Sequence, residues 1–552
     1  MMKPISFNRN NLGTANSPYL LQHAQNPVWW QEWSRDAVEE AARRDVPIFV
    51  SSGYATCHWC HVMASEAFSD PSTADLLNRN FVCVKVDREE RPDIDHYLME
   101  FIQSRSGRGG WPLNVFMTPS MEPFLAFTYL PVESSHGMPG LIQVASHVTE
   151  HYMEKGSPAG TFEPSRNLPD PATREEVLTG LQRMFDRQYG GFGREQKFPP
   201  HCTLVFLLSL LLLEDNPDAR LMCSRTLDAM SLGGLNDHLQ GGVFRYCVDR
   251  EWKIPHFEKM LYDQAMSLWC YSLAFRAFGH ERYRDMAESL IRCLDECFRS
   301  EGLFLSALDA DTGHEEGATY LWSYGELEEI LGHEGLEAMK DVYDVSEGGN
   351  FEGKNHLVRL SHKKMPEIEE KLLKVRKKRE QPGADTKILC GINALAAIGL
   401  LQAGKSLGSA KYGEEAKSLV ERILETFWDG DRLAHCLAGG VLQEQSFLFD
   451  AAAVLAAVSM LAEGDPSWRG TMDELRVFAL SFRDNDGWVE SRPDDFHHVT
   501  ASVFDHPTPS STAMALFALT RADLLSGRKP ERTPFRQPFS ADFFNVVAFL
   551  GG

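Results

Sequence analysis

The chain has 552 residues, of which 43% are hydrophobic and 24% are charged. This length and balance predict two or more globular domains, each large enough to bury a core of its own. The formal net charge of −23 argues against nucleic acid and anionic membranes as partners, because phosphate groups are bound by clustered lysine and arginine side chains.

The N-terminal segment and the cysteines bear on where the protein works. The first residues, MMKPISFNRNNLG, lack the apolar stretch of a signal peptide. The most apolar run, at 204–213, is too short to span a bilayer and predicts a buried helix instead. The 11 cysteines follow no framework pattern, so most are expected to be reduced and buried. We therefore expect a cytoplasmic protein without a membrane partner.

The first part of the chain alternates short apolar strands with helical stretches. Strands are predicted at 46–52, 81–87, 111–119 and 122–131, and helices directly after residue 57 and at 94–105. Strand–helix–strand–helix followed by a hairpin is an α/β pattern with a small central sheet. We expect this domain to span residues 1–154. The segment 155–172, rich in Pro, Gly and Ser, is expected to be a linker.

The remaining residues, 173–552, are dominated by helical periodicity. Apolar residues recur at helical spacing at 174–186, 201–213, 218–233, 260–278, 283–299, 391–406, 411–427, 446–463, 469–483 and 510–526. Glycine-containing turns lie between these segments. Helical hairpins repeated about six times predict a closed ring of paired helices, an (α/α)6 toroid, although an open superhelical stack of hairpins fits the same pattern.

The sequence CHWCH, which begins at Cys57 and includes Cys60 and His61, has three possible chemistries: a thiol–disulfide couple, half of a zinc site or a covalent anchor for haem. Haem attachment needs export, for which no signal is visible. Zinc needs two further ligands; His61 and Cys83 are available, but Cys83 lies in an apolar strand that predicts a structural role. Exposed and inactive thiols are a further alternative, and we expect no metal and no other cofactor.

The position of the two cysteines favours the dithiol interpretation. Cys57 follows a predicted strand and opens a helix, whose N-terminus stabilises the nucleophilic thiolate. Cys60 lies one turn further on, where a resolving thiol belongs. A charged His58 would stabilise the thiolate further and make the couple more oxidising. Pro112 begins a strand after Gly-Gly-Trp and is predicted to be cis, since X–Pro bonds alone reach that form at low cost.

A second set of candidates lies in the toroid, where ring-shaped helical domains place a funnel. The candidates for substrate binding are His58, Trp59 and Trp111 beside the dithiol, and Asp237, His238, Tyr246, His256, Glu258, Asp309 and Asp311 in the toroid. Paired carboxylates or histidines perform acid–base chemistry on sugars. The alternative is structural, because Asp and His at helix starts commonly cap N–H groups.

Several long motifs resemble the spermatogenesis-associated protein 20 family. They are NSPYLLQHAQNPVWWQEW (16–33), GYATCHWCHVM (53–63), VKVDREERPDID (84–95), GGWPLNVFMTP (109–119), GGFGREQKFP (190–199), GGVFRYCVDREWKIPHFEKMLYDQA (241–265), SALDADTGHEEGATYLW (306–322) and FEGKNHL (351–357). The resemblance covers most of the chain. It implies a thioredoxin-like domain followed by a six-hairpin glycosidase-like toroid, in agreement with the patterns above.

The chain also departs from the family pattern. Ser51 stands where thioredoxins keep a buried acid, so efficient general thioredoxin activity is not expected. Residues 126–129, 392–394 and 509–513 differ from the family's Gly-Gly-Thr-Tyr, Trp-Asn-Gly and Pro-Ser-Gly-Asn-Ser, and the chain is shortened after residue 131. These changes fall in loops expected to line the mouth of the toroid, where a family activity would be altered or lost.

Two functions follow as hypotheses. In the first, Cys57, Cys60 and Pro112 form a thiol–disulfide exchange site, and the toroid binds a protein disulfide client or another ligand. In the second, the protein acts on or binds a small sugar-like ligand, and the thioredoxin-like domain is regulatory or structural. A folding or assembly factor without turnover is a third reading.

Overall fold

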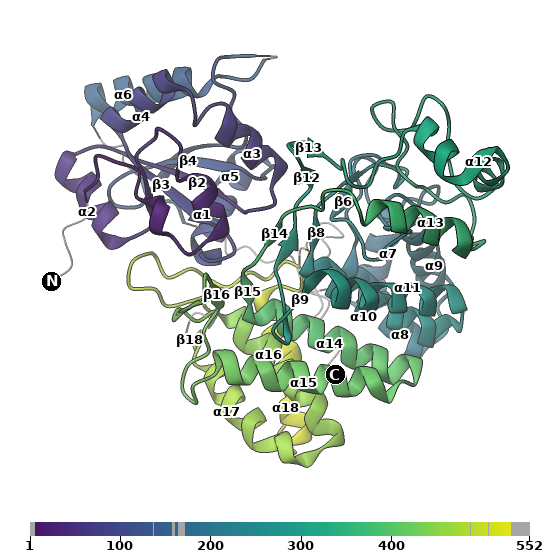
Figure 1. Ribbon diagram of the computed structural model, residues 1–552. Coiled ribbons are helices and arrows are strands. Elements are labelled where there is room, and N and C mark those ends of the chain that lie inside the picture. The colour runs from purple at the N-terminus through teal and green to yellow at the C-terminus, as the bar shows by residue number, and fades with distance from the viewer. Residues whose placement is uncertain are drawn as a thin grey trace.

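The computed structural model describes residues 6–135, 137–156, 160–163, 172–485, 487–505 and 507–531. Within these ranges a sheet domain, purple and blue in Figure 1, is followed by a helical domain in teal, green and yellow. Most of the predicted linker 155–172 and the end of the predicted toroid, 532–552, lie outside the described residues.

The sheet domain contains a five-stranded sheet in the described part of the chain. Its strands are β1 (Trp30–Glu32), β2 (Ile48–Gly53), β3 (Val82–Asp87), β4 (Leu113–Met117) and β5 (Pro123–Phe127), in the order β1-β3-β2-β4-β5. β1, β3 and β2 run parallel, and β4 and β5 add an antiparallel hairpin. The predicted α/β domain is therefore confirmed. The sequence analysis did not predict β1, which is only three residues long.

Helices cover both faces of this sheet. They are α1 (Pro18–Gln22), α2 (Arg35–Arg44), α3 (His58–Ser65), α4 (Pro71–Asn80), α5 (Pro92–Ser106) and α6 (Leu141–Lys155). Because side chains alternate along a strand, Ile48 and Val50 pack with α2 and α5, whereas Phe49 packs with α3, α4 and α6. The two apolar layers hold the C-terminal end of β2, and hence the start of α3, in a fixed position.

The helical domain consists of pairs of helices. In the described residues they are α7 (Arg174–Met184), α8 (His201–Leu213), α9 (Pro217–Leu232), α10 (Leu261–Phe278), α11 (Glu281–Cys293), α12 (Tyr324–Lys340), α13 (Pro366–Arg376), α14 (Cys390–Leu407), α15 (Ala410–Phe427), α16 (Leu448–Gly464), α17 (Arg469–Leu480) and α18 (Ser511–Leu525). Helices α8, α10, α14, α16 and α18 are buried along most of their length, and each packs on the next in that order.

The ring returns on itself through α18. Phe517 of α18 lies 6.0 Å, ring centroid to ring centroid, from Trp269 of α10, and the predicted toroid of paired helices is confirmed. One pair departs from the regular arrangement. Helices α12 and α13 pack on each other around Leu336 and Leu372 in a separate apolar cluster, and they lie at the edge of the molecule in Figure 1. None of the described helices has both the length and the apolar character required to cross a bilayer.

Buried ion pairs join the two domains. Nζ of Lys387, which lies just before α14, is 2.7 Å from Oδ2 of Asp87, 3.3 Å from Oε2 of Glu89 and 2.6 Å from Oδ2 of Asp385. Ser306 adds a 3.0 Å hydrogen bond to Glu89. Because Asp87 and Glu89 belong to the motif VKVDREERPDID, this motif forms part of the contact between the domains.

Segments that follow the predicted sheet domain in the chain also pack into its apolar core, so the two domains are not divided sharply at residue 173. Phe496, from the segment before α18, packs in the apolar layer of the sheet domain against Trp33 and Tyr97. Phe162, from the described part of the predicted linker, packs against Tyr97 and Phe101. Two segments that follow the sheet domain in the chain thus complete the same apolar layer of that domain.

Candidate functional site

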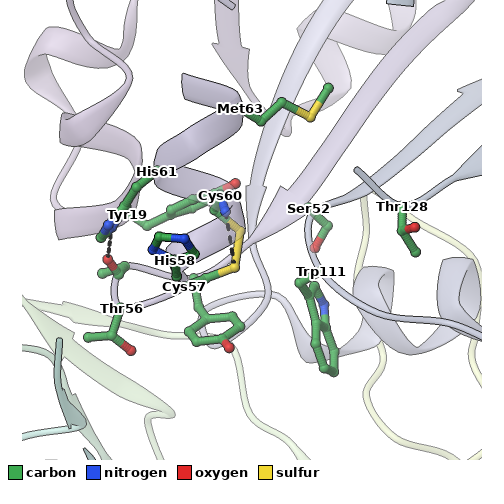
Figure 2. Close-up of a disulfide and its surroundings, with 12 residues drawn as sticks. Tyr19, Ser52, Thr56, Cys57, His58, Cys60, His61, Met63, Trp111 and Thr128 are labelled. Carbon is green, nitrogen blue, oxygen red and sulfur yellow. Dashed lines mark hydrogen bonds between the residues drawn. A yellow bond between two sulfur atoms is a disulfide. The ribbon is translucent and has the colours of Figure 1, made fainter. Parts of the chain in front are cut away.

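The two cysteines of the CxxC motif form a disulfide at the start of α3 (Figure 2). Cys57 is the N-cap residue, and its Sγ accepts a hydrogen bond from the backbone N–H of Cys60 at 3.3 Å. The side chains are buried, with exposed fractions of 3% and 1%. The structure therefore places Cys57 at the positive end of the helix dipole, where a thiolate is stabilised.

The bond between Trp111 and Pro112 is cis, as predicted. Figure 2 shows Trp111 beside the disulfide and close to Ser52. The indole Nε1 of Trp111 donates a 2.9 Å hydrogen bond to Asp95, and the hydroxyl of Ser52 donates to the same carboxylate at 2.6 Å. These bonds fix the indole ring next to the cysteines.

Behind the disulfide lies a buried lysine. Nζ of Lys85 donates to the hydroxyls of Tyr19 and Ser51 at 3.1 and 3.0 Å. Burial lowers the pKa of Lys85 well below its ordinary value. The backbone of Gly53 passes so closely that a Cβ there would lie 2.5 Å from Oη of Tyr19 and 2.8 Å from Sγ of Cys60. The hydroxyl of Tyr19 thus lies between the region of the Cys60 sulfur and the amine of Lys85.

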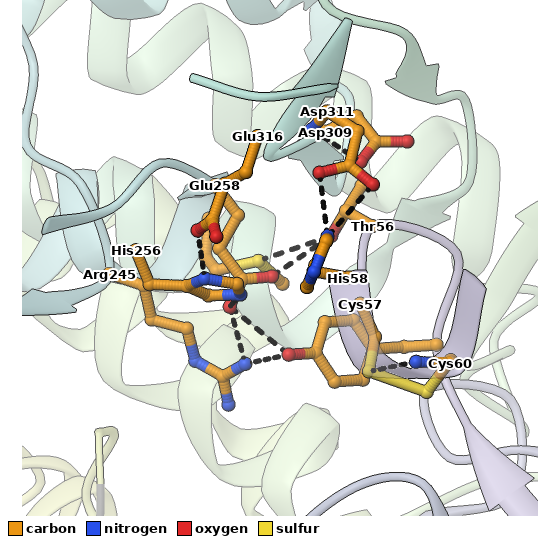
Figure 3. A network of polar contacts seen from close by, with 12 residues as sticks. Thr56, Cys57, His58, Cys60, Arg245, His256, Glu258, Asp309, Asp311 and Glu316 are labelled. Carbon is orange, nitrogen blue, oxygen red and sulfur yellow. Dashed lines mark hydrogen bonds and ion pairs between the residues drawn. A yellow bond between two sulfur atoms is a disulfide. The ribbon is translucent and has the colours of Figure 1, made fainter. Parts of the chain in front are cut away.

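Two histidines of α3 meet two aspartates of the helical domain, and Figure 3 shows His58 beside Asp309 and Asp311. Nδ1 of His58 donates to Asp311 at 2.9 and 3.0 Å. His61 donates from Nε2 to the carbonyl of Ala55 at 2.7 Å, and its Nδ1 lies 3.3 Å from Asp311 and its Nε2 3.8 Å from Asp309. The ligand atoms of His61, Asp309 and Asp311 all lie within 4.8 Å of one another, so these three residues could hold a metal ion.

The charges in this cluster support one another. The hydrogen bond from His58 to Asp311 raises the pKa of the histidine. Burial acts to lower the pKa of His61, but the hydrogen bond to Asp311 and the charge of Asp309 outweigh it, and the pKa is raised. Burial raises the pKa of Asp309 to about 6. Burial also opposes ionisation of Asp311, but its bonds to the two histidines keep its pKa below the ordinary value.

A second network continues deeper into the domain contact, around Glu258 (Figure 3). The carboxylate accepts from Oη of Tyr54 at 3.1 Å, from Thr56 at 3.3 Å and from Nη1 of Arg245 at 2.7 Å. Arg245 also donates to the hydroxyl of Tyr54. Burial acts to raise the pKa of Glu258, but the charge of Arg245 outweighs it, and the pKa is lowered. Tyr54 and Thr56 immediately precede the CxxC motif, so this network ties the motif to the ring.

His256 extends this network toward the surface. It hydrogen-bonds Glu316 through Nδ1, and its Nε2 lies 3.6 Å from Glu258. Its ring is 5.3 Å from that of Tyr246 and 6.2 Å from that of His58, measured between ring centroids. The structure thus brings Tyr246, His256 and Glu258 from the helical domain to the vicinity of the CxxC motif.

Two predicted residues lie apart from this site. Asp237 is buried and paired with Arg376 at 2.8 Å and with Lys259 at 2.7 Å. Burial alone would raise the pKa of Asp237, but the charges of the two cations outweigh it, and the pKa is lowered. His238 donates to the carbonyl of Gly233 at 3.0 Å. These contacts hold the loop before α10 in place. Trp59 points outward: it is 49% exposed.

The sequence analysis missed four residues that the structure places at the site: Tyr54, Lys85, Arg88 and Arg245. All four lie inside motifs that carry the family resemblance. Arg88 and Arg245 both lie over the rings of Tyr54 and Trp111, with guanidinium carbons 4.0 to 5.6 Å from the ring centroids. Their place in these motifs could have marked the four residues as candidates. The sequence does not show, however, that residues so far apart along the chain lie together in the fold.

Comparison with solved structures finds distant similarities. D-mannose isomerase matches with 12% identity over 64% of this chain and 80% of its own, at a TM-score of 0.43. A GH76 alpha-mannanase of Bacteroides thetaiotaomicron matches with 10% identity over 68% of this chain and 92% of its own, at a TM-score of 0.38.

Comparison with known sequences is more informative. The family model Thioredox_DsbH, described as a protein of unknown function (DUF255), matches residues 9–169. Spermatogenesis-associated protein 20 of Mus musculus is 35% identical over 536 residues, which are 83% of this chain and 68% of that protein. The protein of the same name in Homo sapiens is 35% identical over 498 residues, 78% of this chain and 63% of its own. The chain therefore spans about two thirds of the length of these relatives, and it belongs to the spermatogenesis-associated protein 20 family.

Proposed function

We propose that the protein is a thiol–disulfide exchange protein whose helical domain binds the client. The observation that carries this proposal is the Cys57–Cys60 disulfide at the N-terminus of α3, beside a histidine whose pKa is raised. In the reduced protein, the Cys57 thiolate attacks a client disulfide and displaces one client thiolate. Cys60 then attacks the sulfur of Cys57, which releases the second client thiolate and closes the disulfide. Two electrons pass to the client.

The buried amine of Lys85 supplies the proton acceptor that this sequence needs at Cys60. Ser51 occupies the position of a buried acid and cannot ionise, but it holds Lys85 in place. Burial lowers the pKa of Lys85 and so favours its neutral amine, which is the form that can accept a proton. The hydroxyl of Tyr19, which contacts Lys85, relays the proton from the region of Cys60.

Burial of the disulfide restricts what can react with it. The sulfur atoms lie beside Tyr54 and Thr56, which are bonded to Glu258 of the helical domain. A rigid folded surface cannot reach such atoms, so the proposed client presents its disulfide in a small molecule or an extended peptide. The exposed ring of Trp59 offers an apolar contact at the edge of the site.

The experiment is to trap the mixed disulfide. Reduced Cys60→Ser protein is incubated with glutathione disulfide, and the product is analysed by mass spectrometry. The expected result is one glutathione attached to Cys57, because the resolving thiol is missing. Cys57→Ser is the matched control and is expected to gain no glutathione. Equal labelling of both variants, or labelling of neither, would contradict the proposal.

A second candidate function is carbohydrate binding by the helical domain. It is favoured by the adjacent aromatic and acid–base groups Tyr246, His256, Glu258 and Glu316, since rings stack on sugars and paired carboxylates serve acid–base chemistry. Calorimetric titration with neutral monosaccharides tests it. Binding that Tyr246→Ala removes would support this function, and no binding at about 1 mM sugar would count against it.

A further inference from the structure

Two arginines at the contact between the domains differ in their hydrogen-bond partners. Two guanidinium groups, those of Arg88 and Arg245, lie over the same two aromatic rings. Glu258 is bonded to Arg245 at 2.7 Å. Among the residues that the structure describes, Arg88 has no carboxylate within ion-pair distance, and its guanidinium makes no hydrogen bond. The Arg88 guanidinium therefore contacts two aromatic faces and keeps its N–H groups without an acceptor in the described part of the chain.

The nearby acids are engaged elsewhere. Asp95 accepts hydrogen bonds from Ser52 and Trp111, and Glu89 is bonded to Lys387 and Ser306. Both acids lie near enough for their charge to act on Arg88, but neither forms an ion pair with it. A half-buried guanidinium without a hydrogen-bond acceptor carries a desolvation cost. Arg88 keeps part of its surface accessible to solvent.

Three buried polar atoms close to these arginines also lack hydrogen-bond partners in the described structure. They are Nε of Arg245, Oη of Tyr262 and Oδ2 of Asp263, and the last two residues have exposed fractions of 6% and 1%. Burial raises the pKa of both Tyr262 and Asp263, and the charges of Arg88 and Arg245 oppose this shift. Native proteins pair nearly all such atoms. What distinguishes these three is that they occur together with two guanidinium groups that share the same aromatic rings, an arrangement that a ligand would complete.

The chemistry of these atoms defines the ligand. Two guanidinium groups bind an oxyanion, either a carboxylate or a phosphate, through charge-assisted hydrogen bonds. The hydroxyl of Tyr262 can donate or accept. Burial raises the pKa of Asp263 well above its ordinary value. A carboxyl group accepts hydrogen bonds, and it also donates one when it is protonated. A phenol and a carboxyl group match hydroxyl groups on the ligand better than a second anionic group.

We propose that Arg88, Arg245, Tyr262 and Asp263 form a binding site for a small hydroxylated organic anion at the contact between the two domains. The arginines bind the carboxylate or phosphate, and the tyrosine and aspartate bind hydroxyl groups. This site specifies the ligand of the helical domain and rests on that part of the proposed function alone. It does not require disulfide exchange. Both domains contribute to it, so the ligand strengthens their contact.

The experiment is calorimetric titration of the full-length oxidised protein with four probes: gluconate, glucose 6-phosphate, inorganic phosphate and neutral glucose. One equivalent of gluconate or of glucose 6-phosphate is expected to bind more tightly than about 1 mM, and glucose is expected not to bind. Binding of gluconate alone identifies a carboxylate site, and binding of the two phosphates alone identifies a phosphate site. If neither organic anion binds, the proposal is overturned.

Variants then locate the binding. Arg88→Gln keeps much of the side-chain length and removes the charge, and it is expected to weaken binding by about tenfold or more. Arg194→Gln, at an exposed arginine of the helical domain, is the matched control and is expected to bind as the unchanged protein does. Equal affinities for the two variants would place the anion elsewhere. Because the protein stays oxidised throughout, a failure of exchange at Cys57 and Cys60 leaves these results intact.

Discussion

Nδ1 of His58, inside the CxxC motif, lies 2.9 Å from Oδ1 of Asp311 in the helical domain. This bond links the residue that follows Cys57 to a hairpin about 250 positions further along the chain. It raises the pKa of His58, because the anion favours the charged imidazole. The helical domain therefore sets the electrostatic environment of the cysteines.

The first prediction concerns the reduction potential. A charged His58 stabilises the Cys57 thiolate and hence the reduced form. His58→Asn is expected to make the couple more reducing, by about 30 mV for about 1.4 kcal/mol of lost stabilisation. The measurement is equilibrium with dithiothreitol or glutathione buffers. His147→Asn, at an exposed position of α6, is the control. An unchanged or higher potential in the His58 variant would contradict the prediction.

The second prediction concerns pH. The raised pKa of His58 gives stability that is complete below about pH 6.5 and is lost as the pH rises through the raised value. Asp309, with a pKa of about 6, acts in the same direction. The lowered pKa of Asp311 gives stability that is lost only as the pH falls below about 3.8 toward its folded value.

Thermal stability is therefore expected to fall as the pH rises between about 6 and 8. Asp311→Asn removes the anion that raises the pKa of both histidines, and it is expected to reduce this slope and to lower the stability near pH 6. Melting temperatures of the two proteins, measured from pH 5 to 9 at constant ionic strength, test this. A slope that is identical in the variant would show that other groups cause it.

The third prediction concerns the buried lysine between the domains. Lys387→Ala leaves Asp87, Glu89 and Asp385 without their shared cation, and it is expected to cost ~3–5 kcal/mol in the free energy of unfolding. Urea unfolding followed by tryptophan fluorescence measures the loss. Lys371→Ala, at an exposed position of α13, is expected to change it by less than about 0.5 kcal/mol. Similar losses for both variants would refute the assigned role.

The fourth prediction concerns Gly53. An added Cβ would lie 2.8 Å from Sγ of Cys60 and 2.5 Å from Oη of Tyr19, and neither atom can move freely in a packed core. Gly53→Ala is expected to destabilise the oxidised protein by about 1–3 kcal/mol. Gly470→Ala, in the exposed first turn of α17 where a Cβ meets nothing within 4 Å, is expected to be neutral or stabilising. Chemical denaturation of both variants provides the comparison.

The predictions that succeeded from sequence rest on local signals. A β-branched strand, a following CxxC and a Gly-Gly-Trp-Pro strand gave the start of α3 and the cis bond before Pro112. Helical periodicity gave the paired helices. The helical segments predicted above do not include α12 or α13. The backbone of α12 is non-helical at Gly332, which interrupts the helical spacing there, and the pair packs in an apolar cluster of its own.

The predictions that sequence could not supply depend on distant pairs. Lys387 and Asp87 are separated by 300 positions, and neither residue alone suggests a domain contact. Asp237 was a candidate for substrate binding because it precedes a glycine turn, but its partner Arg376 lies 139 positions away. Arg88 and Arg245 face the same rings for the same reason: the fold, not the local sequence, brings them together.

Thiol–disulfide exchange by Cys57 and Cys60 can be tested by a redox titration of the pair in glutathione buffers, read by mass-resolved thiol labelling. A reversible two-electron transition is expected between about −120 and −270 mV. A pair that never closes or never opens across this range would contradict this expectation, and so would a stoichiometric zinc ion bound by the two thiols.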